Sequence, residues 1–134
     1  MSGLAWTAYG ARVAQSQGSD LYSIGNNRIL LGSEYSAKYN LNYSVPYDAS
    51  WYRCEAVLVN GPWSDISSAD RGVSSARPIW DIIYYEYVVK RGLPGPWTTR
   101  AKQTVVEGHY TSDDHASWGD LIWAWPNSTT KHFE

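Results

Sequence analysis

The sequence has little cysteine, little phenylalanine and little net charge, and it contains no long apolar run. With one cysteine in 134 residues, Cys54, no disulfide can form within the chain, which favours a reducing compartment. Cys54 lies inside an apolar run, so we expect a small buried residue rather than a nucleophile. A net charge of −2 provides no field to hold a phosphate backbone, so nucleic acid is not expected as a partner.

The absence of two further features bears on location. No apolar stretch approaches the roughly 20 residues that cross a bilayer, so no transmembrane segment is expected. The first residues do not combine a basic region with an apolar core, as a signal peptide does. The expected location is therefore the cytoplasm, or the exterior by a route without a signal peptide.

The aromatic residues are unusual in kind. The chain has eight Trp and eleven Tyr but one Phe. Trp and Tyr combine a flat apolar face with a polar tip, which suits half-wet surfaces such as binding sites and interfaces. The alternative is that a small β-protein uses them for strand propensity and packing.

Hydrophobic periodicity indicates strands. From Tyr35 to Tyr47, aromatic and apolar residues alternate with polar ones, which is the period of a half-buried strand. Residues 21–24 and 28–31 flank Gly25-Asn26-Asn27, which tolerates positive φ, so we expect a hairpin there. No segment shows a helical apolar stripe longer than about two turns.

One arrangement occurs twice. An aromatic and β-branched run is followed by Gly-Pro-Trp-Ser at residues 61–64 and by Gly-Pro-Trp-Thr at residues 95–98. We interpret the pair as two long strands, each with a tryptophan just beyond a sharp turn. The segment Trp51–Asp65 resembles the last two strands of a fibronectin type III module over about fifteen residues. In that family this motif lies near the end of the domain, and here it lies in the middle, so the likeness is not extended to the rest of the chain.

These patterns predict an all-β fold with little helix. Turn residues recur about every ten positions, which favours an antiparallel β-sandwich of about seven to nine strands, with a small β-barrel as the alternative. We expect one domain over residues 1–134, with residues 131–134 frayed. Further strands are predicted at residues 4–13, 51–59, 79–89 and 118–125, and residues 98–110 are expected to hold another, centred on 103–107.

Catalytic and metal-binding arrangements are weak. His109, Asp113 and His115 have metal-ligating side chains, but their spacing matches no strong ligand signature, and a solvated polar loop explains them equally well. Neither a nucleophile elbow nor a glycine-rich phosphate loop is present. A paired-carboxylate glycosidase would draw on strand carboxylates, and the candidates are Glu55, Glu86 and Glu107. By strand parity these side chains point outward, so we expect neither an enzyme nor a cofactor.

The remaining chemistry is recognition of sugars by aromatic faces. A sugar ring stacks on Trp or Tyr, while neighbouring polar side chains hydrogen-bond its hydroxyls. We predict a lectin-type, multivalent and homo-oligomeric glycan-binding protein. The expected contacts are tryptophans near turns with adjoining polar residues: Asn60, Trp63, Asp65, Trp97, Thr99, Arg100, His115, Trp118 and Asp120. The alternatives are a membrane-active or toxin-like module and a structural subunit that binds other proteins.

Overall fold

The computed structural model describes residues 2–48, 64–68, 71–72, 79–104 and 119–124, and these residues are helical, not all-β. The described residues contain no strand, so the predicted sandwich and its barrel alternative are both wrong for this part of the chain. The elements are α1 (Ser2–Ser16), α2 (Ile24–Asn40), α3 (Trp80–Ile83), the π-helix η3 (Tyr84–Lys90), α4 (Pro96–Thr104) and α5 (Gly119–Ile122).

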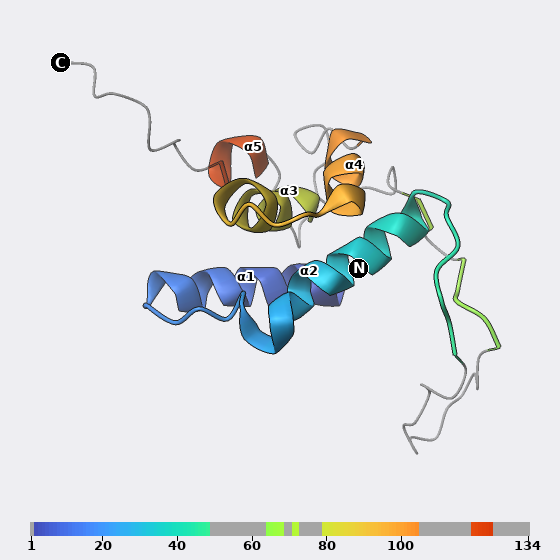
Figure 1. Ribbon diagram of the computed structural model, residues 1–134, viewed down its shortest axis with the longest axis horizontal. Helices are drawn as coiled ribbons and strands as arrows, with labels where there is room; N and C mark the ends of the chain where they lie inside the picture. The colour runs from blue at the N-terminus through green and yellow to red at the C-terminus, as the bar shows by residue number, and fades with distance from the viewer. Residues whose placement is uncertain (1, 49–63, 69–70, 73–78, 105–118, 125–134) are drawn as a thin grey trace.

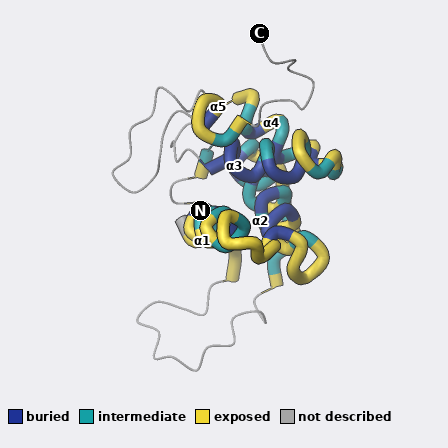
Figure 2. The backbone as a smooth tube through the Cα atoms, turned by 90° about the vertical axis from the view of Figure 1, so that its left-hand side faces the viewer, coloured by how far each residue is buried: buried dark blue, intermediate teal, exposed yellow. Residues whose placement is uncertain are grey.

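The helices form two layers. Helices α1 and α2 lie together, and α3, η3, α4 and α5 lie above them (Figure 1). Helix α2 makes its most extensive contacts with α4. Buried segments concentrate where the two layers meet, whereas much of the outer side of α1 is exposed (Figure 2).

The buried positions of α1 and α2 do not form an apolar stripe. In α1 the buried positions are Ala5, Ala8 and Ala11, each three residues after the last. In α2 the buried series from Leu30 continues through polar and small residues, namely Ser33, Ala37 and Asn40. Small residues allow close approach of helices, but they do not register as an apolar stripe.

The upper layer supplies the large buried side chains. Ile79, Trp80, Ile82 and Ile83 are almost completely buried, and Tyr87 of η3 joins Tyr22 in an edge-to-face contact with ring centroids 5.5 Å apart. A continuous apolar run of this kind is compatible with a buried helix as well as with a central strand. The predicted strand at residues 79–89 is a helical segment.

The expected hairpin at Gly25-Asn26-Asn27 begins a helix instead. All three residues have positive φ, at 61°, 57° and 59°, as their sequence indicated. They produce a kink at the start of α2 rather than a connection between two strands.

The second Gly-Pro-Trp sequence is likewise a helix start. Pro96 occupies the first position of α4, where its missing N–H costs nothing, and the Thr99 N–H donates to the Gly95 carbonyl at 2.8 Å. The described residues do not include residues 61–63 of the first copy, the fibronectin-like segment up to residue 63, Cys54, His109, Asp113 or residues 131–134.

A buried carboxylate ties η3 to α1. Glu86 is 2% exposed, and its Oε1 accepts hydrogen bonds of 2.8 Å from both Gln15 Nε2 and Arg91 Nε. Lys90 Nζ lies 3.2 Å from Oε2. Arg91 also forms a two-pronged ion pair with Asp20, at 2.6 and 3.1 Å, so one guanidinium bridges two carboxylates. Glu86 is therefore not one of the outward-facing charges that strand parity predicted.

None of the helices among the described residues is both long enough and apolar enough to cross a membrane.

Candidate functional site

One face of the α2–α4 pair gathers aromatic rings and cations. Each of these residues is exposed or partly exposed, and each takes part in a cation–ring or ring–ring contact. We call this set the aromatic–cation face: Lys38, Tyr39, Tyr43, Arg71, Trp97 and Arg100.

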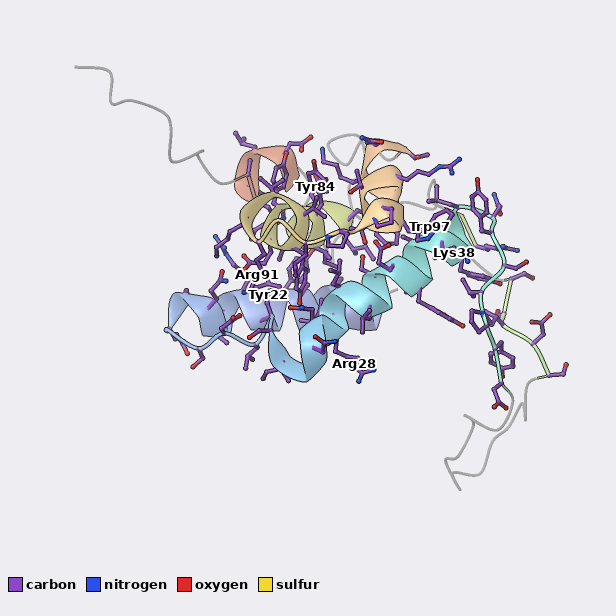
Figure 3. The ribbon with its side chains drawn as sticks, in the orientation of Figure 1. Tyr22, Arg28, Lys38, Tyr84, Arg91 and Trp97 are labelled. Carbon is purple, nitrogen blue, oxygen red and sulfur yellow. The ribbon has the colours of Figure 1, made fainter. Side chains whose placement is uncertain are left out.

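Its centre is the contact between Tyr43 and Trp97. The two ring centroids are 4.8 Å apart with a 55° tilt. Lys38 Nζ lies 5.5 Å from the Trp97 ring, and the Arg100 guanidinium lies 5.2 Å from the Tyr43 ring. Lys38 and Trp97 lie side by side in Figure 3, at the end of α2 opposite to Arg28. Each cation gains a ring quadrupole as a partner while its charged group keeps access to solvent.

The end of α2 places Tyr43 over Trp97. The Asn42 N–H donates to the Tyr39 carbonyl at 3.1 Å, and the Tyr43 N–H donates to the Lys38 carbonyl at 3.1 Å. With Asn42 at φ 70°, these bonds form a Schellman motif, in which a left-handed residue reverses the chain and satisfies the last carbonyls of the helix. The reversal brings the residue after Asn42 back across α4.

Arg71 attaches a distant loop to the same helix end. Its Nε donates to the Tyr39 carbonyl at 2.9 Å, its Nη2 donates to the Tyr43 carbonyl at 3.2 Å, and its guanidinium covers the Tyr39 ring at 4.2 Å. In return, the Tyr39 hydroxyl donates to the Ser67 carbonyl at 2.9 Å. The Arg71 cation thus binds one carbonyl in the last turn of α2 and one just beyond it, at the negative end of the helix dipole.

A carboxylate beneath the face holds the start of α4. Glu34 Oε1 accepts the Thr98 N–H at 2.8 Å, and Oε2 accepts the Trp97 N–H at 3.1 Å. The buried hydroxyls of Ser33 and Thr98 share a hydrogen bond of 2.7 Å in the same interface. Because Glu34 is engaged by the helix N-terminus, its charge offsets the helix dipole.

The three cations of the face have no acidic partner among the described residues. Lys38, Arg71 and Arg100 form cation–ring contacts, and Arg71 donates to carbonyls, but none forms an ion pair with a carboxylate of this part of the chain. A depression of about 580 Å³ continues the surface beside Arg100. It is lined by Pro94, Gly95, Pro96, Thr99, Arg100 and Gln103.

The structure brings three of the predicted contact residues together. Trp97, Thr99 and Arg100 lie in the first half of α4. Trp97 is half-buried and packs against the core, whereas Arg100 is exposed. Asp65 is exposed in the segment 64–68, where its Oδ1 accepts the N–H of Ile66.

Asp120 belongs to another cluster. Its Oδ1 lies 2.6 Å from Lys102 Nζ and accepts the Tyr85 hydroxyl at 2.6 Å, while Asp81 Oδ1 lies 3.8 Å from the same ammonium. Hydrogen bonds from Lys102 and Tyr85 lower the pKa of Asp120. Burial, together with the hydrogen bond to Asp120, raises the pKa of Tyr85 well above its usual value. Asp120 is therefore ionised and the Tyr85 hydroxyl neutral at neutral pH.

The remaining predicted contacts, Asn60, Trp63, His115 and Trp118, lie outside the described residues. Within the described ranges, no group of three or more His, Cys, Asp or Glu side chains could hold a metal ion.

Comparison of the chain with protein-family models, curated proteins and solved structures gave no match.

Sequence reasoning missed Lys38, Tyr39, Tyr43 and Arg71. Tyr35, Tyr39 and Tyr43 recur every four residues, which is also the spacing of one face of a helix. The alternation used to predict a strand contains this helical spacing, so the signal was present but assigned to the wrong period.

The turn at Asn42 gives a first testable expectation. Replacing Asn42 with alanine should lower the free energy of unfolding by about 1 kcal/mol, because a left-handed backbone is costly for a side chain without a local polar group. The matched variant Asn42→Gly should leave stability close to that of the wild type. Urea denaturation followed by circular dichroism measures both. Equal losses in the two variants would mean that the left-handed turn does not govern this helix end.

Proposed function

We propose that this chain binds a saccharide on the aromatic–cation face and prefers an acidic one. The supporting observation is that Arg100 and Lys38 flank the Tyr43–Trp97 pair without a carboxylate partner among the described residues. Aromatic faces stack on the C–H surface of a sugar, and free cations add charge-assisted hydrogen bonds to a carboxylate or sulfate on it.

The geometry divides the roles within the face. Trp97 is half-buried, and its ring already contacts Tyr43 and Lys38, so it supports the surface from below. Tyr43 is 39% exposed and is the ring that we expect the sugar to contact. Thr99 and Gln103, which line the depression beside Arg100, supply donors and acceptors for hydroxyls of a neighbouring sugar unit.

Oligomerisation and multivalent display remain predictions. Weak single sites gain useful avidity when several act together. Light scattering on the purified chain would measure the number of subunits.

Loss of Arg100 should weaken glycan binding about tenfold or more, since one charge-assisted hydrogen bond contributes about 1.5–3 kcal/mol. Loss of the Tyr43 ring should also weaken binding, because it removes the surface on which the sugar stacks. The experiment screens an array of uronic-acid, sulfated and neutral oligosaccharides and then titrates the best ligand into Arg100→Gln and Tyr43→Ala. Binding of the wild type should weaken with added salt, as screened charge pairs do.

The matched control is Arg28→Gln, which removes an exposed arginine at the opposite end of α2. It should bind as the wild type does. Equal affinity for neutral and acidic sugars would contradict the proposed preference for an acidic saccharide. Unchanged affinity in both face variants, with their circular dichroism intact, would contradict the assignment of the site.

A further inference from the structure

A second concave surface lies between α1 and the start of α2. It is a groove of about 400 Å³. Its walls come from α1 and from the segment around the kink in α2: Thr7, Gly10, Ala11, Leu21, Ile24, Arg28 and Ile29. It shares no residue with the aromatic–cation face.

The backbone makes room for this groove. A Cβ built on Gly10 would have no heavy atom within 4 Å, so glycine leaves open space on the α1 wall. On the other wall, Gly25 has φ 61°, and a Cβ there would lie 3.3 Å from the Arg28 Cβ and 3.6 Å from its Nε. The missing side chain of Gly25 therefore accommodates the stem of Arg28. The left-handed residues Gly25-Asn26-Asn27 separate Ile24 from Arg28, and both of these line the groove.

The described lining of the groove is mostly apolar and carries one charge. Leu21 and Ile24 are 41% and 60% exposed, so both present apolar side chains to water at the groove. Among the described residues, Arg28 is the one charged side chain that lines it, and Arg28 forms no ion pair with a carboxylate of that part of the chain. In Figure 3, Arg28 lies on the side of α2 that faces away from η3 and α4.

We propose that this groove binds a small amphipathic carboxylate with a single aliphatic chain. Its volume lies within the roughly 300–1,000 Å³ of small-molecule sites, which are largely apolar with few polar groups that fix orientation. The aliphatic chain of the ligand covers Leu21, Ile24 and the open surface at Gly10. The carboxylate pairs with the Arg28 guanidinium, whose planar fork suits two oxygens.

Decanoate, below its micelle concentration, is the probe, and isothermal titration calorimetry with ¹H–¹⁵N spectra is the measurement. We expect saturable one-to-one binding with shifts at Gly10, Leu21 and Ile24. Decanol, which keeps the chain but lacks the charge, should bind about tenfold more weakly, and decyltrimethylammonium should not bind.

Two variants test the site independently. Arg28→Gln should weaken decanoate binding about tenfold or more, and Gly10→Leu should abolish it by filling the groove. Arg28 is exposed and without an ion pair in the described chain, so its loss should not disturb folding. The matched controls are Arg100→Gln on the other face and Ser16→Leu, which places a leucine side chain at an exposed position of α1 outside the groove.

Three outcomes would overturn the proposal. These are equal affinity for decanoate and decanol, unchanged affinity in Arg28→Gln, and non-saturable binding. A dimer that Gly10→Leu dissociates, without decanoate binding, would show instead that a second copy of the chain covers the groove. Arg100→Gln should weaken only saccharide binding, and Arg28→Gln should weaken only decanoate binding. Failure of one proposal is therefore distinguishable from failure of the other.

Discussion

Replacing Glu86 with alanine should lower the free energy of unfolding by about 3–5 kcal/mol, the range measured when one partner of a buried ion pair is removed. The carboxylate is 2% exposed and accepts bonds from Gln15 and Arg91 at 2.8 Å. Without it, the Arg91 guanidinium keeps Asp20 as its carboxylate partner but loses the buried one. Gln15 loses an acceptor at the contact between α1 and η3. Urea denaturation of both proteins gives the difference.

Acid should reduce the contribution of the Glu86 charge to stability, which the variant Glu86→Gln isolates. Burial by itself would raise the pKa of Glu86, but hydrogen bonds from Arg91, Gln15 and Lys90 outweigh burial and lower the pKa below its ordinary value of 4.5. A lowered folded-state pKa contributes stability above the unfolded value, and this contribution is lost as pH falls through the folded value. The wild type should therefore approach Glu86→Gln in stability as pH falls below about 4.5.

The control for Glu86 is Asp120→Asn, which removes an exposed carboxylate that is also paired with a lysine. Exposed pairs typically contribute about 0.2–1 kcal/mol, so this variant should change stability little. Similar losses in Glu86→Ala and Asp120→Asn would show that burial does not set the strength of the Glu86 cluster.

Part of the local structure could be predicted from the sequence. Gly25-Asn26-Asn27 was expected to have positive φ, and it does. The same three residues fit both a hairpin turn and a kinked helix start. Tolerance of positive φ depends on each residue alone, whereas the type of element on either side depends on the rest of the fold. The hydrophobic pattern on either side distinguishes the two, and here its alternation predicts strands where the structure has a helix.

The helical period was hidden by the chemistry of the interface. Ser33 and Thr98 are completely buried, and their shared hydrogen bond removes the cost of burying two hydroxyls. A search for apolar stripes treats such positions as solvent-facing. The buried alanines of α1 are equally inconspicuous, while the exposed Trp6 and Val13 on the same helix suggest a stripe that does not face the core.

Only those residues of the candidate site that are close together in the sequence could be predicted. Trp97, Thr99 and Arg100 are neighbours in the chain and on α4, so composition alone could associate them. Lys38 and Arg71 reach the same face through the packing of α2 on α4 and through a loop that crosses the end of α2. Contacts of that kind depend on tertiary structure and have no signature in a single sequence.

Replacing Glu34 with alanine should lower the free energy of unfolding by about 2 kcal/mol, since helix-capping acceptors contribute about 0.5–2 kcal/mol and a carboxylate is stronger than a neutral cap. Its two oxygens accept the N–H groups of Trp97 and Thr98, and Thr98 is completely buried. The loss should loosen the first turn of α4, which carries Trp97 and Arg100. Saccharide affinity should then fall in this variant as well, although Glu34 itself is not expected to contact the sugar.

Hydrogen exchange of the Trp97 and Thr98 amides measures the effect at its origin. Protection of both amides should decrease in Glu34→Ala. Glu34→Gln, which keeps one acceptor oxygen, should retain more of the stability. Lys38→Gln, a substitution four residues later on α2, removes a charge without removing a hydrogen bond, and should change stability by no more than about 0.5 kcal/mol. Protection that is unchanged in Glu34→Ala would mean that packing against α2 fixes the start of α4 and that the carboxylate is dispensable. A loss of protection without a loss of saccharide affinity would place the sugar site away from the first turn of α4, because a site built on Trp97 and Arg100 depends on the order of that turn.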